Sequence, residues 1–462
     1  MGQAPSLPDD AVADVLRRLA PRDVAACRRV CKTLRRVVDG HRLLRADLLP
    51  LKLGGIFLNF FQLRSATQFL SRPTTGAAVS GRLGYTLDAC HPDYDFQPVP
   101  YVLDHCNGLL LLRHCVVNPA TQQWAPLPPA PDLPKPAPSI KHVYKSRYLV
   151  FDPMLSPNHF DLLIMPEISF MEECEEFEWP PSTLILPVFS SKIGSWEKRT
   201  FYRDGGAAGT VPGLVGVRLD CNERQSAYWR GSLYISCDNC FILRISLLSD
   251  NSYRVIRLPT RLSLDDSQGD QQFYLGKSTK GIYCASRVTS RRSHLQVWFL
   301  NDLNEWVLKH DKDIFPVLPN LDYVNPYGPW ILQQFDYDEH SDEDDSVVED
   351  NREAVEKEKF EAIVKQGKFE WDSDNDNVLE PGSSCGGTDT CFLGFHPFKD
   401  VVFVTLWDRV LAYHWSSSKL QDLGKLFPEF YVDRHHIYWH TQVEVSFLYT
   451  PYWLGELPEK LN

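Results

Sequence analysis

The chain has 462 residues, of which 43% are hydrophobic and 23% are charged. This length and composition can build one large or two medium-sized cores, which excludes global disorder. The net charge of −12 at pH 7 is concentrated in residues 336–380, where 18 acidic side chains accompany 5 basic ones. The first 45 residues carry ten Lys or Arg and five Asp or Glu, so a basic N-terminal segment precedes a near-neutral body.

The apolar runs of the chain are far shorter than the roughly 18 residues that span a bilayer. Asp9, Asp10 and Asp14 lie where a secretory peptide needs an apolar stretch, so no signal sequence is predicted. The 12 cysteines of such a chain are then expected to be reduced thiols. We expect a cytoplasmic and/or nuclear protein without stable membrane association.

Residues 1–50 have the pattern of a small three-helix module. A first apolar stripe follows Pro8, at positions Val12, Val15, Leu16 and Leu19. Pro21 interrupts it, and a second series runs to Gly40 through Val24, Cys27, Cys31, Leu34 and Val38. Helices this short bury little surface, so their remaining apolar face is expected to contact a partner.

From about Gly81 the period of the pattern changes to two, which predicts a mainly antiparallel all-β domain. A unit of strand, polar turn, aromatic residue and strand recurs at residues 111–127, 184–201, 241–258, 295–309 and 401–423. Such repetition favours a β-propeller over a sandwich. The fold class expected is therefore α+β and multidomain.

The domain division follows from these shifts. Residues 51–80 are predicted as a connector, and residues 81–335 and 381–462 as the β domain. The acidic stretch 336–380 is predicted to be a disordered insertion, because it has few core-forming residues. The proline-rich stretch Pro126 to Pro138 is predicted to be an extended surface loop.

Short motifs for bound groups are incomplete. Gly276-Lys277-Ser278 resembles the end of a phosphate-binding loop, but the required earlier glycine is Gln271. Asp372, Asp374 and Asp376 lack the later bidentate Glu of a calcium loop. Cys237 and Cys240 lack a second ligand pair for zinc. No metal, cofactor or catalytic residue is predicted.

Other features have an ordinary structural explanation. His105-Cys106 would place an imidazole and a thiol on opposite faces of one strand, which is poor geometry for a nucleophile and its base. The start Met1-Gly2 fits only a loose myristoylation pattern. The basic run from Arg28 to Arg36 could contact phosphates, but the solvated face of a helix is favoured, so no nucleic acid is expected.

The N-terminal residues resemble the F-box. The resemblance is carried over about 40 residues by Leu7-Pro8-Asp9-Asp10, Val15-Leu16-Arg17-Arg18-Leu19, Asp23-Val24, Cys27-Arg28-Arg29-Val30-Cys31-Lys32 and Leu34-Arg35. Leu34 departs from the Trp that is usual in the family. Phrases such as His105-Cys106-Asn107-Gly108, Val117-Asn118-Pro119, Phe151-Asp152-Pro153 and Gly394-Phe395-His396-Pro397 resemble the associated domain of the large plant F-box families.

The resemblance implies a non-catalytic substrate receptor of a cullin-based ubiquitin ligase. The adaptor contacts that it carries over are Leu7, Pro8, Leu16, Leu19, Val30, Cys31 and Leu34. They would bind an SKP-type adaptor and through it a cullin, while the β domain would hold a protein substrate of unknown identity. The alternatives are a β-rich scaffold whose helices bind another partner, a propeller enzyme, and a decayed family member.

Overall fold

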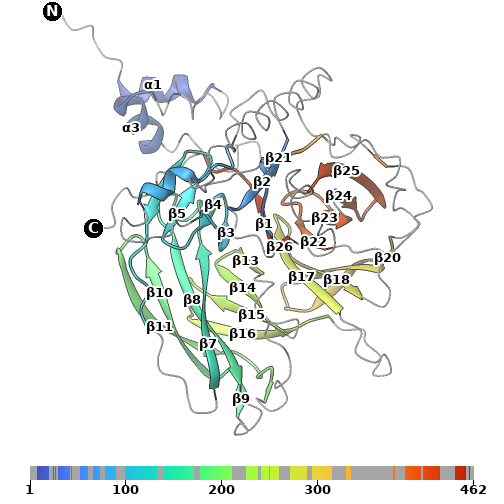
Figure 1. Ribbon diagram of the computed structural model, residues 1–462. Coiled ribbons are helices and arrows are strands. Elements are labelled where there is room, and N and C mark those ends of the chain that lie inside the picture. The colour runs from blue at the N-terminus through green and yellow to red at the C-terminus, as the bar shows by residue number, and fades with distance from the viewer. Residues whose placement is uncertain are drawn as a thin grey trace, which may run out of the picture.

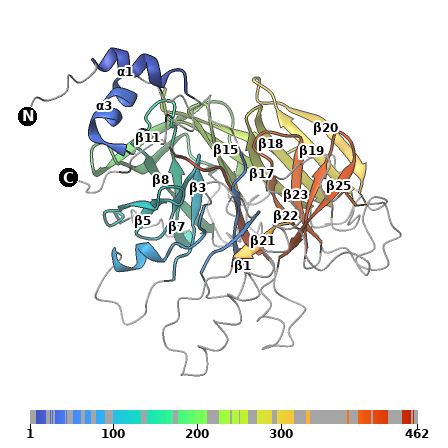
Figure 2. The same cartoon turned by 90° about the horizontal axis from the view of Figure 1, so that it is seen from above.

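The computed structural model shows two helices at the periphery of a large β region (Figures 1 and 2). It describes residues 8–19, 24, 27, 30–41, 43, 52–60, 66–72, 79–89, 99–132, 140–170, 177–210, 225–237, 241–248, 250–259, 271–288, 294–314, 329–333, 378–379, 391–406, 409–426, 443–453 and 457. Among these residues, no helix has the length and hydropathy needed to cross a membrane.

The helical module contains α1 (Asp9–Leu16) and α3 (Lys32–Gly40). α1 begins after Pro8, whose carbonyl accepts the Val12 N–H at 3.1 Å. The module has its own core, formed by Ala13, Leu16, Val24, Val37 and Val38. The described residues thus hold two helices and not the predicted three, because the stretch between them is described only at positions 24, 27 and 30.

Cys31 caps the N-terminus of α3. Its carbonyl accepts the Arg35 N–H at 3.0 Å, and its Sγ accepts the Leu34 N–H at 3.5 Å. The thiol therefore occupies the place of the oxygen that usually accepts such a bond.

We expect Cys31→Ser to stabilise the module by about 0.5 kcal/mol, because a hydroxyl is a stronger acceptor than a thiol at this position. Thermal unfolding followed by circular dichroism at the helical wavelength would measure it. Cys31→Ala is the matched control and should destabilise the module. A Ser variant less stable than the Ala variant would show that the cap is unimportant.

The two ends of the β region share one sheet. Its order is β21 (Ile331–Gln333), β2 (Gln68–Ser71), β1 (Gly55–Phe60) and β26 (Val443–Tyr449). β1 pairs antiparallel with β26 from Gly55↔Tyr449 to Phe60↔Val443. β1 and β2 lie in the stretch predicted as a connector, where a short apolar run builds a fully buried strand.

Three further four-stranded sheets are antiparallel and follow the chain order. They are β3 (Asp104–Cys106), β4 (Leu109–Leu111), β5 (Cys115–Asn118) and β6 (Gln123–Pro126); β17 (Gln271–Ser278), β18 (Gly281–Val288), β19 (His294–Leu300) and β20 (Trp306–Asp313); and β22 (Phe392–Phe395), β23 (Val401–Leu406), β24 (Arg409–His414) and β25 (Lys419–Lys425). The predicted hairpins at 111–127, 295–309 and 401–423 are confirmed.

An eight-stranded sheet consists of two antiparallel halves. One half contains β7 (Ile140–Val150), β8 (Asp161–Phe170), β10 (Thr183–Ser190) and β11 (Ser195–Arg203), and the other β13 (Ser226–Trp229), β14 (Ser232–Cys237), β15 (Phe241–Ser246) and β16 (Ser252–Arg257). Small additions are β9 (Glu178–Trp179) with β12 (Gly209–Thr210) and the 3-10 helix η2 (Gly84–Ala89).

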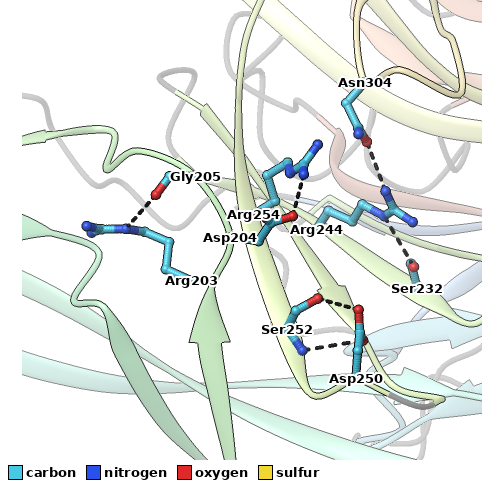
Figure 3. A network of polar contacts seen from close by, with 9 residues as sticks. All are labelled: Arg203, Asp204, Gly205, Ser232, Arg244, Asp250, Ser252, Arg254 and Asn304. Atoms are coloured by element: carbon cyan, nitrogen blue, oxygen red, sulfur yellow. Dashed lines mark hydrogen bonds and ion pairs between the residues drawn. The ribbon is translucent and has the colours of Figure 1, made fainter.

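The halves are joined where β11 and β16 run parallel. Only Tyr202↔Ser252 and Arg203↔Tyr253 are paired there. The junction is reinforced by an ion pair between Asp204 and Arg254 (Figure 3). With the halves counted separately, the described residues form six four-stranded units.

One edge strand of each unit lies next to an edge strand of a neighbouring unit. β3 contacts β7 and β26, β26 contacts β22, β22 contacts β17, and β17 contacts β13. Apolar clusters fill the spaces between units, such as the cluster that Tyr234 and Ile242 form with Phe273 and Trp298. The β region is therefore held together by packing between sheets as well as within them.

Candidate functional site

The helical module exposes apolar side chains on its surface. Val15 is 58% exposed, Val30 is 73% exposed and Leu19 is 38% exposed. α1 cannot bury all of its apolar stripe, because Ala13 and Leu16 already face the module core. Three apolar side chains of this small module are therefore open to solvent. We call Val15, Leu19 and Val30 the apolar surface of the module.

The predicted contacts separate into three groups. Pro8, Leu19, Val30 and Cys31 are exposed, and Leu34 is half-buried against the module core. Leu16 is 4% exposed and belongs to the core, so its side chain is not available to a partner. Leu7 lies outside the described residues. Val15 was not among the predicted contacts, although its place in the apolar stripe signals it.

Charged residues connect the two helices of the module. Arg36 Nη2 donates to Asp9 Oδ2 at 3.0 Å, which ties α3 to α1. His41 Nε2 lies 3.6 Å from Asp10 Oδ1 on the same two elements. Both carboxylates lie in the first turn of α1, where they also face the positive end of the helix dipole.

A polar cluster lies where the adjoining edge strands of the units meet. We call these strands, β3, β7, β13, β17, β22 and β26, the inner strands. Lys277 Nζ in β17 donates to Asn107 Oδ1 at 2.7 Å and to the Tyr228 carbonyl at 2.8 Å. Asp104 in β3 accepts the Leu149 N–H at 2.7 Å and the Ser226 hydroxyl at 3.1 Å. These bonds connect four units, so the cluster positions the inner strands.

Burial governs the protonation of this cluster. Loss of hydration raises the pKa of Asp104 to about 6, against the opposing effects of its hydrogen bonds and of Lys277. Burial likewise lowers the pKa of His105 to about 3 and raises the pKa of Cys106 to about 11. The imidazole is therefore neutral and the thiol protonated at pH 7, which is the opposite of an activated nucleophile.

The raised pKa of Asp104 predicts a pH-dependent stability. Because the folded protein binds this proton more tightly than the unfolded chain, the contribution of Asp104 to the free energy of unfolding should rise as the pH falls from about 6 to 3.8. Comparison with the Asp104→Asn variant isolates this contribution. The difference in the free energy of unfolding between the native chain and the variant should change by up to about 3 kcal/mol over this pH range. Urea unfolding at several pH values measures it, and a constant difference would contradict the assignment.

The other motifs lie in ordinary structural positions or outside the described residues. Gly276-Lys277-Ser278 is part of strand β17 and does not form a loop. Cys237 is half-buried at the end of β14, whereas Cys240 and the Asp372 to Asp376 motif lie outside the described residues. In the described part of the chain, no group of three His, Cys, Asp or Glu side chains could hold a metal.

Asn107-Gly108, part of a phrase that carries the family resemblance, joins β3 to β4. Both residues have positive φ, 47° and 94°, as a tight hairpin turn requires. A Cβ at Gly108 would lie 2.5 Å from Tyr452 Cβ, so the turn also allows the C-terminal segment to pass closely.

Comparisons with known proteins inform the helical module only. No curated protein matches the chain. One similar solved structure, the extracellular domain of a one-component system from B. thetaiotaomicron, has 8% identity and a TM-score of 0.17. That match covers 82% of this chain and 56% of the other, so this chain spans little more than half of it, and the likeness carries no argument. The model of the F-box domain matches residues 5–46, and these residues of the chain form an F-box domain.

Proposed function

We propose that this protein is the substrate-recognition subunit of an SKP-cullin-F-box ubiquitin ligase. F-box domains bind SKP-type adaptors, and thereby a cullin, and generally belong to non-catalytic receptors. In this proposal the chain brings a substrate close to the transfer machinery and contributes no reacting group.

The observation that carries the proposal is the apolar surface of the F-box. Val15, Leu19 and Val30 are exposed, whereas other apolar side chains of the module form its core. Their burial against an adaptor would contribute about 1.5–3 kcal/mol for each fully buried side chain. Pro8, Cys31 and Leu34 complete the proposed contact, and Leu16 supports it from beneath.

In the same proposal, the β domain is a propeller with six blades that holds the substrate. Six four-stranded units, neighbouring inner strands and the pairing of β1 with β26 support this architecture. The chain enters the domain at Gly54, whose N–H donates to the Tyr449 carbonyl at 2.8 Å.

The test is capture of a purified SKP-type adaptor by the intact chain and by a chain that starts at Lys52. The β region has apolar clusters without residues of the helical module, so the shortened chain should fold. We expect capture by the intact chain only. No capture by the folded intact chain would favour a scaffold that uses its helices for another partner.

A further inference from the structure

We propose that Arg244 anchors a docking surface that binds a carboxylate side chain of a partner protein. Arg244 lies in β15 and reaches from its own unit toward the turn between β19 and β20 (Figure 3). Its Nε donates to Ser232 Oγ at 3.3 Å, and its Nη1 donates to Asn304 Oδ1 at 3.1 Å. Two neighbouring units thus hold one half-buried guanidinium in a fixed position.

Both partners of Arg244 are neutral. A guanidinium has five N–H donors, and two of them are used here. The described residues between 225 and 259 contain four arginines and one acid, Asp250. Asp250 accepts the Ser252 hydroxyl at 2.7 Å within its own turn. Arg244 therefore keeps a positive charge and unused donors that an external anion can satisfy.

The neighbouring arginine determines the kind of anion. Arg244 is directly paired with Arg254 across β15 and β16, so both side chains leave the same face of the sheet. Arg254 is neutralised by the carboxylate of Asp204 (Figure 3). Of these two arginines, Arg244 alone keeps an uncompensated charge. Its parallel N–H donors match one carboxylate better than a phosphate that carries nearly two charges.

Two exposed leucines adjoin the residues that Arg244 contacts. Leu303, 75% exposed, directly precedes Asn304 in the turn that contacts Arg244. Leu248, 60% exposed, lies against Gly231, beside Ser232, the other contact of Arg244. Arginine is one of the residue types enriched in protein-binding hot spots. The partner that fits is a peptide segment with an acidic residue between two apolar ones.

An acidic residue of the same surface opposes the binding of an anion. Asp302 is exposed in the same turn, and its charge and that of Arg244 both act on the Tyr234 hydroxyl. Asp302 forms no ion pair with Arg244, so it lowers the local positive potential without filling the site. Its removal should strengthen binding of an acidic partner. This proposal rests on the proposed receptor function in one respect, namely that the bound partner would be a substrate.

The experiment measures fluorescence anisotropy of a labelled Leu-Ser-Glu-Ser-Leu peptide with the intact protein. We expect Arg244→Gln to weaken binding at least about tenfold and Asp302→Asn to strengthen it about twofold. Arg199→Gln is the matched control, because Arg199 is paired with Glu197 at 2.7 Å on the outer strand β11. This control variant should bind like the native chain.

Three results would overturn the proposal: no binding of the peptide, equal binding of a peptide with Gln in place of Glu, or unchanged affinity of the folded Arg244→Gln variant. Tighter binding of a phosphoserine peptide would also contradict the carboxylate assignment. Adaptor capture by the same samples distinguishes failure of the docking surface from failure of the proposed function, because Arg244→Gln leaves the F-box unchanged.

Discussion

Asp422→Ala is expected to destabilise the β region by about 3–5 kcal/mol. Arg409 Nε donates to Asp422 Oδ1 at 3.0 Å, and the two side chains are only 5% and 7% exposed. Removal of the carboxylate takes a buried negative charge away from the side of the buried guanidinium. Urea unfolding followed by tryptophan fluorescence would measure the loss.

The double variant Arg409→Met with Asp422→Leu separates the cost of losing one member of the pair from the contribution of the pair as a whole. It should recover most of the lost stability, because an apolar pair removes both desolvation penalties. Recovery will be incomplete by about 1 kcal/mol, since the Gly424 N–H also donates to Asp422 Oδ1. A single variant that loses less than about 1 kcal/mol would contradict the importance of this pair.

Val15→Asp and Leu16→Asp are expected to weaken adaptor binding for different reasons. Leu16 lies in the module core, so a carboxylate there should unfold the helices at a cost of about 4 kcal/mol or more. Val15 is exposed, so its variant should keep the native helical signal and lose at least about tenfold in adaptor affinity. Circular dichroism and calorimetric titration together measure both.

Two outcomes with these variants would contradict the assignments of Leu16 and Val15. A folded Leu16→Asp module would disprove the core assignment. Unchanged adaptor affinity of Val15→Asp would exclude this side of α1 from the interface. Leu16 alone, the obvious target from sequence, could not have distinguished loss of the fold from loss of the contact.

Local patterns were sufficient to predict the hairpins of the β region. Asn304 and Asn107-Gly108 have positive φ in their turns, and asparagine and glycine tolerate this conformation, which is a property of the sequence alone. The F-box was also recognisable, because its motif is contiguous over residues 5–46. Period and turn chemistry are local, so they can be interpreted without tertiary contacts.

Properties that depend on register and long-range packing were not predictable. Nothing in the sequence links Arg244 to Asn304 or Lys277 to Asn107, since each contact depends on how separate units are placed. The same limit explains why Leu16 was predicted as an adaptor contact although it lies in the core of the module. The stripe of α1 identifies an apolar face, but only the position of α3 determines which of its residues are covered.

The most direct test of the receptor assignment is calorimetric titration of an SKP-type adaptor into the intact chain and its Val30→Asp variant. Val30 is 73% exposed on the F-box, and Ile193→Asp, at a residue 65% exposed in the β region, is the matched control. We predict tight binding by the native and Ile193→Asp chains and binding at least about tenfold weaker for Val30→Asp. Equal affinity of all three, or no binding by the native chain, would contradict the account.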